Sequence, residues 1–476
     1  MKSQPPIPEP LWTTVPPEAQ AAVLAVVAAL QTRIDALEAA LRDLQAKLKL
    51  DSTNSSKPPS SDFVGLKRKP PTPPSGRKRG GQRGRPKAFR ALVPPEKLRS
   101  TTDCKPDSCR RCGQELRGAD SAPLIHQVAD IPKIEPIVDE YRLHRLTCTR
   151  CGTSTCGTLP EGVPAGCFRP YAQAVLATFA GAYRLSKRQI QQLAGDLLGL
   201  SISTGTISKL ERRSARTLAE PYREAARSIH EADAVNIDET GWRENRRKAW
   251  LWVTATASAT VFTVGRNRSA EVAKSLLGDK EDLVLTSDRY SAYNWKSTYW
   301  RQLCWSHLRR DFQAMIDRGG LGEPIGRRLL KLSDGVFKLW HRRRDDPWET
   351  DAMRKRILRM RPTVGRVLRA GTRCGCARTS GTCVEILRVE EGLWNFACNA
   401  DVEPTNNAAE RALRHAVIWR RIAGGTDSES GSRFVERMLT AVATCRQSGR
   451  NVLNYLTSCF EADLMRQAIP SLLAVT

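Results

Sequence analysis

The sequence is short of acidic residues relative to basic ones, and it contains no long apolar run. Its 476 residues include 76 Lys and Arg but only 50 Asp and Glu, which gives a net charge of +26. Such an excess indicates a polyanionic partner, either nucleic acid or an anionic membrane surface. The longest unbroken apolar run, Ala21–Leu30, is about half of the ~20 residues that a membrane span needs.

The N-terminus also lacks the apolar core of a secretory signal, since it reads Met-Lys-Ser-Gln-Pro-Pro. We therefore expect a cytoplasmic protein, associated with the nucleoid when bound to DNA, that has no membrane partner. At roughly 100–200 residues per domain, the length predicts about three domains.

Apolar residues recur in steps of four and three through the N-terminal region. The series is Val23, Val27, Leu30, Ile34, Leu37, Leu41, Leu44 and Leu48. This is the a/d heptad of a coiled coil, and it predicts that residues 1–50 mediate homo-oligomerisation. The alternative is a helix that packs on its own domain, but Pro-rich sequence on both sides leaves it no obvious local partner.

Residues 51–100 lack helical periodicity and carry dense positive charge. Between residues 57 and 99, thirteen Lys and Arg stand against only two acidic residues. Such a composition cannot build a core, and it predicts a disordered basic linker. Within it, Arg83-Gly-Arg-Pro-Lys87 resembles an AT-hook, in which Arg83, Arg85 and Lys87 would enter the minor groove of A·T-rich DNA. The alternative is plain attraction to phosphates.

Two Cys-x-x-Cys pairs, each followed by Gly, are separated by 35 residues. The pairs are Cys109 with Cys112, and Cys148 with Cys151. In a cytosolic chain such pairs more often bind metal than form disulfides. Each turn presents two thiolates and Gly permits the tight backbone, so residues 101–160 are predicted to hold a structural Zn²⁺ closed by four Cys. Unpaired thiols or a redox pair are the alternatives. Two nearby cysteines could replace a ligand, Cys104 and Cys156.

Residues 161–232 have a helix–short turn–helix cadence that is typical of a DNA reader. Arg188–Leu198 reads as a first helix, and Ser203–Arg213 reads as a second helix after a turn at Gly199. The second helix would present four side chains near a groove: Thr204, Thr206, Lys209 and Arg213. An ordinary helical hairpin is the alternative.

After residue 232 the pattern becomes α/β. The β-like runs are Ala234–Asp238, Lys248–Ala255, Val261–Val264 and Leu283–Thr286. The second and third predict an antiparallel meander, and Ser269–Leu277 is expected to be helical before the fourth. From about residue 312 to 395 the sequence is helical and very basic, and a further helix starts near Thr405.

Three acidic residues of this region can converge. Asp238 closes the first strand, Asp288 closes the fourth, and Glu410 lies on the late helix. Mg²⁺ prefers carboxylate oxygens with water and substrate phosphate, and two such ions stabilise both oxygens of an in-line displacement. Alone this triad is weak, because 50 acidic residues offer many such sets. Glu410 could instead complete a capping box with Asn407, and the aspartates could be ordinary strand-end carboxylates.

Several motifs have an order and spacing that are specific when taken together. They are Asn54–Asp62, Gly80-Gly-Gln82, the two Cys pairs, Asp238-Glu-Thr240, Trp250-Leu-Trp252, Ser287–Tyr293, Cys304–Phe312 and Asn406–Arg411. On these motifs the chain resembles transposases of the insertion-sequence-66 family over nearly its whole length. The resemblance implies an RNase-H-like mixed-sheet catalytic core with an Asp-Asp-Glu triad, here Asp238, Asp288 and Glu410. It also implies a helical insertion, which fits the 122 residues between the last two carboxylates.

The chain departs from the family pattern in two places. Many relatives carry Asp directly before the Asn-Asn pair, where this chain has Thr405, which makes Thr405 a candidate N-cap. Gly80-Gly-Gln82 is followed by Arg-Gly-Arg-Pro-Lys, where relatives often have Pro-Gly-His, and this adds positive charge. His307 could orient water or phosphate or merely pack, and we assign it no catalytic role.

We therefore predict a metal-dependent DNA transposase. Mg²⁺ or Mn²⁺ at the triad would activate water to cut at the element ends, and the exposed 3′-hydroxyl would then attack target DNA. Lys and Arg of the linker and insertion would hold double-stranded DNA by its phosphates. The alternatives are a zinc-containing DNA-binding regulator without catalysis, and a metal-dependent nuclease without strand transfer. Accessory proteins of the same element could be needed.

The predicted multidomain α/β organisation has eight segments. They are the coiled coil (1–50), the basic linker (51–100), the zinc-binding module (101–160), the helical DNA-binding region (161–232), the first part of the catalytic core (233–311), the helical insertion (312–399), the Glu-bearing helix of the core (400–440) and a C-terminal helical tail (441–476).

Overall fold

The computed structural model describes residues 8–48, 91–345 and 350–473. It divides the chain into two compact units, and each is described by itself. One unit is Gly65–Ile137, and the other comprises Met1–Val64 and Val138–Thr476. Most of the predicted basic linker, including Arg83, Arg85 and Lys87, lies outside the described residues.

The smaller unit, Gly65–Ile137, is mostly extended chain where it is described. It contains the short 3₁₀ helix η2, Pro95–Lys97, and an antiparallel bridge between Ser108 and Glu115. The side-chain amide of Gln127 exchanges two hydrogen bonds with the backbone of Val93, at 2.8 and 2.9 Å.

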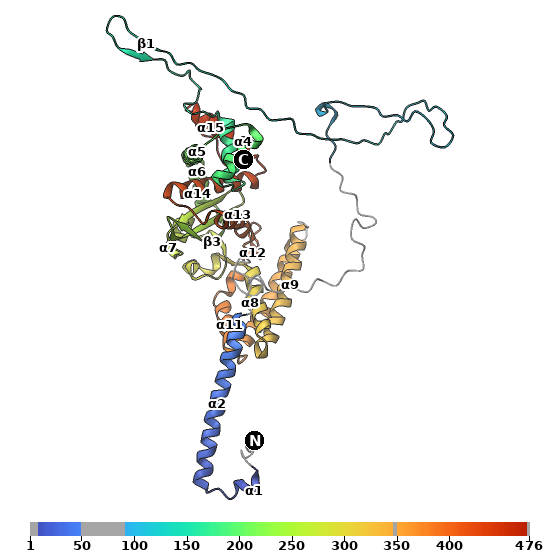
Figure 1. Ribbon diagram of the computed structural model, residues 1–476. Helices are drawn as coiled ribbons and strands as arrows, with labels where there is room; N and C mark the ends of the chain where they lie inside the picture. Colours follow the sequence, from blue (N-terminus) through green and yellow to red (C-terminus); the bar gives the residue numbers. More distant parts are fainter. Residues whose placement is uncertain (1–7, 49–90, 346–349, 474–476) are drawn as a thin grey trace. The chain divides into compact units, whose positions relative to one another are not determined.

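The larger unit carries all other described elements (Figure 1). Its α-helices are α1 Glu9–Trp12, α2 Pro17–Leu48, α3 Pro170–Gly181, α4 Lys187–Leu198, α5 Thr204–Thr217, α6 Ala219–Glu231, α7 Ala270–Leu277, α8 Trp305–Arg318, α9 Glu323–Asp345, α10 Thr350–Gly371, α11 Ala377–Arg388, α12 Asn395–Cys398, α13 Asn407–Ala423, α14 Glu429–Gln447 and α15 Val452–Leu464. Its 3₁₀ helices are η3 Ser291–Tyr293, η4 Thr298–Trp300, η5 Gly320–Gly322 and η7 Glu390–Leu393. Its strands are β1 Arg145–Thr147, β2 Ser154–Cys156, β3 Ala234–Glu244, β4 Arg247–Ala255, β5 Thr260–Gly265, β6 Val284–Ser287 and β7 Arg301–Leu303.

The predicted N-terminal helix is α2, a single helix of 32 residues. Its described heptad side chains, from Val23 to Leu41, are exposed, for example Leu30 at 55% and Leu37 at 64%, so pairing with a second copy stays a prediction. By mean hydropathy, Pro17–Glu38 is the one segment of the described residues that is long and apolar enough to cross a membrane. One such helix near an N-terminus is weak support for a membrane protein, because the four–three spacing of a coiled coil requires the same apolar residues.

A mixed five-stranded sheet forms the centre of the core. The strand order is β5-β4-β3-β6-β7, in which β4 is antiparallel to both β3 and β5, whereas β3, β6 and β7 run parallel to one another. The four predicted strands and the helix before the fourth are confirmed, but the first strand continues to Glu244 because it pairs with β4 from Asn236 to Glu244. Asp238 therefore lies within β3 and does not close it as predicted. The strand β7 was not predicted. Strand β3 pairs Asn236 with Thr286 of β6, so Asp238, within β3, lies level with Asp288, which directly follows β6.

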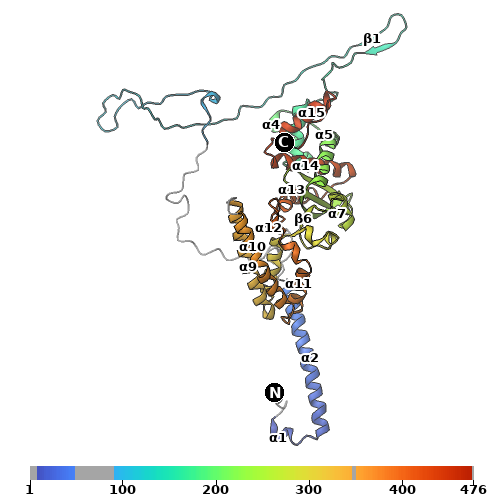
Figure 2. The same ribbon diagram turned by 180° about the vertical axis from the view of Figure 1, so that it is seen from behind.

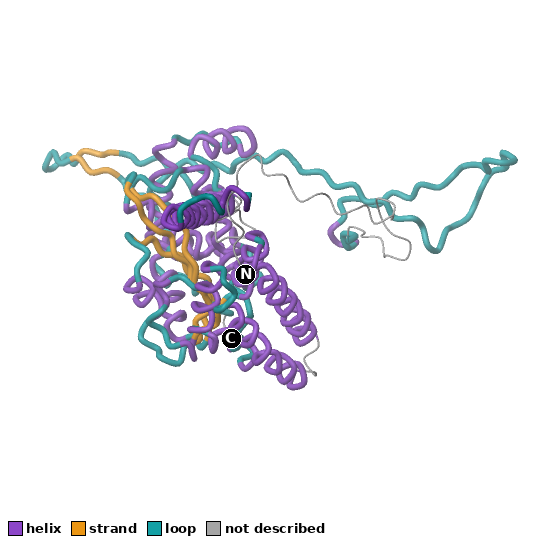
Figure 3. The backbone as a smooth tube through the Cα atoms, turned by 90° about the horizontal axis from the view of Figure 1, so that it is seen from below, coloured by secondary structure: helices purple, strands orange, loops and turns teal. Residues whose placement is uncertain are grey.

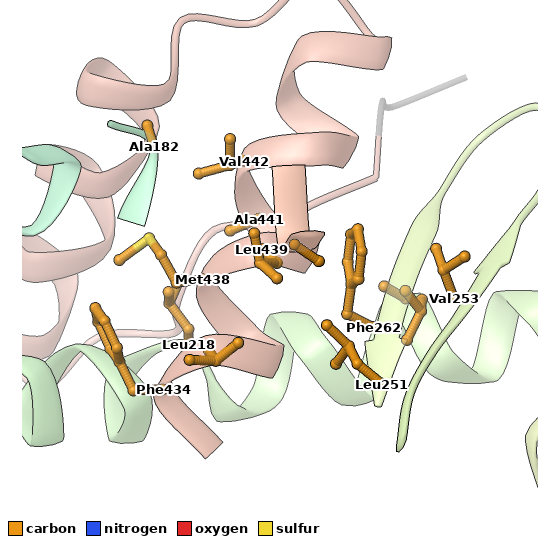
Figure 4. Close-up of a cluster of buried hydrophobic side chains, with 14 of the residues drawn as sticks. Ala182, Leu218, Leu251, Val253, Phe262, Phe434, Met438, Leu439, Ala441 and Val442 are labelled. Atoms are coloured by element: carbon orange, nitrogen blue, oxygen red, sulfur yellow. The ribbon is translucent and has the colours of Figure 1, made fainter. Parts of the chain in front are cut away.

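Helices lie on both sides of the core strands (Figure 3). Along the outer strand β5, three side chains of α14 accept the free backbone N–H groups. These are Glu436 to Val264, Thr440 to Phe262 and Thr444 to Thr260. Their spacing of four residues places all three on one helix face, so the helix closes this sheet edge. In Figure 4, Leu439 of α14 lies toward Leu251 and Phe262 of the sheet.

The predicted helical insertion is confirmed as helical. Helices α8 to α12 form a second apolar core, in which Trp305 and Phe312 of α8 are buried with Leu368 of α10. Figure 2 shows α9, α10, α11 and α12 grouped together. The rings of Trp305 and Trp394 meet edge to face, with centroids 5.4 Å apart. Helix α8 begins at Trp305, several residues before the predicted boundary at residue 312, and therefore its first turn lies beside the sheet.

Candidate active site

Asp238 and Asp288 lie at the same level on neighbouring central strands. The pairing of Asn236 with Thr286 places Asp238 of β3 beside Asp288, which directly follows β6. Both side chains are half-buried. Each carboxylate accepts a local backbone hydrogen bond of 2.9 Å, Asp238 from the N–H of Glu239 and Asp288 from the N–H of Tyr290. The sheet therefore fixes the positions of both side chains.

The third carboxylate, Glu410, lies in the first turn of α13. This helix is tied to β3 by Asn406, whose Nδ2 donates to the backbone oxygen of Ile237 at 2.7 Å. The side-chain oxygen of Asn406 in turn accepts from Asn236 at 3.1 Å. Both contacts lie within two residues of Asp238, so they place the start of α13 against this part of β3.

Two expectations about this helix are wrong. The N-cap of α13 is Asn406, and not Thr405, because helical geometry begins only at Asn407. Asn406 makes no side-chain capping bond, since its amide reaches across to β3. Glu410 therefore belongs to no capping box with Asn407, and its carboxylate is free of that role.

Electrostatics indicate that the three carboxylates are close together. Burial raises the pKa of Asp238 well above its usual range, and the charges of Glu239, Asp288 and Glu410 raise it further. Like charges that interact this strongly disfavour joint ionisation unless a cation compensates them. Asp288 and Glu410 thus lie near enough to Asp238 for their charges to act on it, and the role of the three as a triad stays a prediction.

Glu239, although adjacent to Asp238, has different partners. Its buried side chain forms an ion pair with Arg268 and accepts a hydrogen bond from the hydroxyl of Tyr293. Arg268 also stacks on Tyr290, with 3.5 Å from the guanidinium carbon to the ring centroid. Glu239 is therefore already paired with Arg268, and its hydrogen bond with Tyr293 holds the segment that follows β6.

Three residues of the α8 turn surround Glu410 and were missing from the predicted site. Nδ1 of His307 lies 3.6 Å from Oε1 of Glu410, and the thiol of Cys304 lies 3.9 Å from the same oxygen. The Arg310 guanidinium lies 3.9 Å from the other oxygen, Oε2. Burial, together with the charge of Glu410, raises the pKa of Cys304 to about 12. The spacing Cys304-x-x-His307 at a helix start was the signal available in the sequence.

The two Cys pairs adopt the same turn, although they lie in different units. In each, the Gly after the second Cys donates to the carbonyl of the first at 2.9 Å, with φ of +76° at Gly113 and +71° at Gly152. Only Gly adopts this left-handed conformation without strain. Backbone hydrogen bonds within the turn lower the pKa of Cys109, and a hydrogen bond with Thr153 lowers that of Cys151. Thiolates are favoured at both turns, and the four-Cys site stays a prediction.

The predicted helix–turn–helix segment is helical as expected. Helix α4 ends at Gly199, and α5 starts after its N-cap Ser203. On α5, Lys209 is exposed, whereas Arg213 forms an ion pair of 2.9 Å with Asp463 of α15. Thr206 lies close to the cap, with its hydroxyl 3.0 Å from that of Ser203. Arg213 thus ties α5 to α15, and base reading by this helix is untested.

A basic chain with a mixed α/β core, two carboxylates on neighbouring parallel strands and a third on an adjacent helix has the features of a nucleic-acid-processing enzyme. A family model described as the transposase IS66 family matches residues 169–433, more than half of the chain. The chain therefore belongs to the IS66 family of transposases. A second model, described as a family of unknown function (DUF6444), matches residues 7–91.

Two relatives come from Sinorhizobium fredii (strain NBRC 101917 / NGR234). The uncharacterized protein y4qI is 27% identical over 239 residues, which cover 44% of this chain and 43% of that protein. The uncharacterized protein y4hP is 23% identical over 379 residues, covering 72% of this chain and 68% of that protein. The chain therefore aligns with less than half of the length of y4qI. No solved structure matches the chain.

Proposed function

We propose that this protein is a DNA transposase with an RNase-H-like core, and that its catalytic carboxylates are Asp238, Asp288 and Glu410. The order and directions of the five strands support this fold. The observation that carries the proposal is the convergence of three carboxylates from separate segments, expressed in the raised pKa of Asp238. Family membership supports DNA as the substrate.

The donor set fits Mg²⁺ or Mn²⁺. All three groups are carboxylates, which hard divalent cations prefer. Their mutual repulsion, visible at Asp238, is the cost that a bound cation would remove. When bound, such ions would polarise the scissile phosphate and stabilise the charge that develops on the attacking and leaving oxygens.

The protein's own groups hold this arrangement in place. Asn406 fixes the start of α13 against β3, so that Glu410 stays beside Asp238. Arg301, which is buried, donates to the backbone oxygen of Asp288 at 3.2 Å and holds the end of β6. Near-attack geometry depends on such positioning, since an error of about 1 Å can cost ~10²-fold in rate.

The helical insertion offers a phosphate-binding surface. Helix α10 exposes six cations: Arg354, Lys355, Arg356, Arg359, Arg366 and Arg369. Contacts of this kind supply affinity and register without reading sequence. Element ends and target DNA would be held here and by the basic linker, while cleavage takes place at the carboxylates.

Assembly and zinc binding complete the proposal. The exposed heptad of α2 would pair with a second copy, because transposition must bring two element ends together. The four Cys of the two turns would bind one structural Zn²⁺.

The test is incubation of the purified protein with Mg²⁺ and labelled DNA that carries the element ends. Joined products would support transposition, nicks alone would indicate a nuclease, and retarded but intact DNA would indicate a regulator. Asp238→Asn, Asp288→Asn and Glu410→Gln should each abolish cleavage with DNA binding largely kept. The matched control is Asp334→Asn, on an exposed acid of α9 outside the site. Near wild-type cleavage by any triad variant would remove that residue from the site.

A further inference from the structure

A cluster of possible metal ligands forms where the start of α8 meets Glu410, and it consists of Cys304, His307 and Glu410. Cys304 is the N-cap of α8, and His307 lies one turn further along the same helix. The N–H of His307 donates to the carbonyl of Cys304 at 3.1 Å, which closes this first turn. Residues three apart on a helix share a face, so the thiol and the imidazole are directed to the same side, where Glu410 lies.

The distances suit a single small cation. The carboxylate Oε1 of Glu410 lies 3.6 Å from Nδ1 of His307 and 3.9 Å from Sγ of Cys304. All three ligand atoms lie within 4.8 Å of one another. A tetrahedral zinc ion with bonds of about 2.0–2.3 Å places its ligand atoms roughly 3.3–3.8 Å apart. The two contacts of Glu410 differ from this range by at most a few tenths of an ångström, and the third pair, Cys304 with His307, lies within 4.8 Å.

The hydrogen bonds of His307 and Cys304 leave their ligand atoms available to a metal ion. Nδ1 of His307 is buried and has no hydrogen-bond partner, since Glu410 lies beyond hydrogen-bond length. A buried polar atom without a partner calls for an explanation, and a bound ion is one. Sγ of Cys304 accepts the backbone N–H of Asn406 at 3.2 Å, a contact that suits a thiolate. The side chains of His307 and Glu410 are 15% and 21% exposed, so an ion has access from solvent.

We propose that Cys304, His307 and Glu410 bind one borderline-soft divalent cation such as Zn²⁺, with three protein ligands and an open coordination position. Thiolate and imidazole select zinc over Mg²⁺, which prefers an all-oxygen sphere. Binding displaces the thiol proton of Cys304 to solvent. One consequence rests on the proposed function. Zn²⁺ at this site occupies Glu410, the carboxylate that the Mg²⁺ site also needs, so zinc inhibits cleavage.

Metal binding is tested with Co²⁺ and the full chain, because Co²⁺ bound by thiolate gives a charge-transfer absorption. The Cys-x-x-Cys turns would contribute to the same signal, so the result is read as a difference between variants. Cys304→Ser should lose about one equivalent of bound Co²⁺ per chain and part of the absorption. His307→Asn should weaken the same equivalent by at least 10-fold, as loss of a ligand exceeds loss of an outer partner. Cys383→Ser, at a buried cysteine of α11 outside the cluster, should bind as wild type.

Unchanged stoichiometry and spectra in both Cys304→Ser and His307→Asn would overturn the proposal. If circular dichroism shows that Cys304→Ser is unfolded, His307→Asn decides alone. In the activity arm, Zn²⁺ added to Mg²⁺-driven cleavage should inhibit the wild type, and excess Mg²⁺ should relieve it. A protein that never cleaves DNA would refute the proposed function, while the Co²⁺ measurement would still decide the metal site.

Discussion

Substitution of Asn406 by Ala should lower the cleavage rate more than it lowers the stability of the fold, because this side chain joins α13 to β3 by hydrogen bonds. The residue is 1% exposed. Its amide donates to Ile237 O at 2.7 Å and accepts from Asn236 Nδ2 at 3.1 Å. Alanine removes both bonds but leaves the backbone N–H that Asn406 donates to Cys304. The change is therefore confined to one crossing point.

The expected loss of stability is moderate. Each hydrogen bond contributes about 0.5–1.5 kcal/mol net, and a buried group left without a partner costs about 1–3 kcal/mol. Asn236 keeps a second hydrogen bond to Thr405 O at 3.4 Å, so the cost of leaving its amide without Asn406 falls at the low end of that range. We expect a loss of about 2–4 kcal/mol, which for a core of roughly 300 residues lowers Tm by roughly 3–6 °C.

The loss of activity should be larger than the loss of folded protein. Without its tie, Glu410 is free to move relative to Asp238, and a displacement of about 1 Å costs ~10²-fold in cleavage rate. Thermal unfolding followed by circular dichroism gives Tm, and single-turnover cleavage well below Tm gives the rate per folded molecule. Asn399→Ala is the matched control, since its amide reaches only Asn395 of its own helix at 3.4 Å. A lower Tm with an unchanged rate would show that Asn406 does not position Glu410.

Three further outcomes are expected. Protein purified without chelator should hold zinc, and Cys148→Ser should lower the content by about one equivalent per chain in metal analysis; unchanged content would refute the four-Cys site. Burial raises the pKa of Glu436 from 4.5 to about 7, so its ionisation should cost stability as pH rises from 4.5 to 7. Glu436→Gln should flatten Tm against pH in that window, and an unaltered profile would contradict this. Finally, Ile34→Asp with Leu41→Asp should lower the solution mass toward 52.9 kDa by light scattering and prevent bridging of two DNA ends. Normal bridging by that variant would assign assembly to another surface.

Sequence pattern predicted the strands that follow simple rules. Lys248–Ala255 and Val261–Val264 combine β-branched and aromatic residues, and both became strands close to the expected bounds. Strand β7 was missed because it reads Arg301-Gln-Leu, which has no strand signature. Its buried Gln302 is satisfied by groups about 90 residues away, the carbonyl of Leu393 and the N–H of Phe396. Only tertiary contacts make such a segment a strand.

The site was predictable in part for a similar reason. Asp238 and Asp288 were linked because each was expected to close a β-like run. The parallel register of β3 and β6 does place them side by side, although β3 continues to Glu244. Glu410 was assigned by resemblance, because no spacing rule carries a side chain across 122 residues. Cys304 and Arg310 were overlooked because they reach Glu410 only through the packing of α8 against α13. This packing depends on α8 beginning at Trp305, before the predicted boundary at residue 312.

The closure of β5 by α14 has a consequence for synthesis on the ribosome. The strand emerges by Gly265, but the residues that accept its N–H groups end at Thr444, roughly 180 residues later. At about 5–20 residues per second, the edge stays open for roughly 10–35 s. During that interval the outer edge of β5 has unpaired N–H groups, to which chaperones or neighbouring chains can bind. Glu410 also emerges in this interval. On the proposed function, a nascent chain whose α13 has not yet emerged lacks the third carboxylate, and we expect it not to cut DNA.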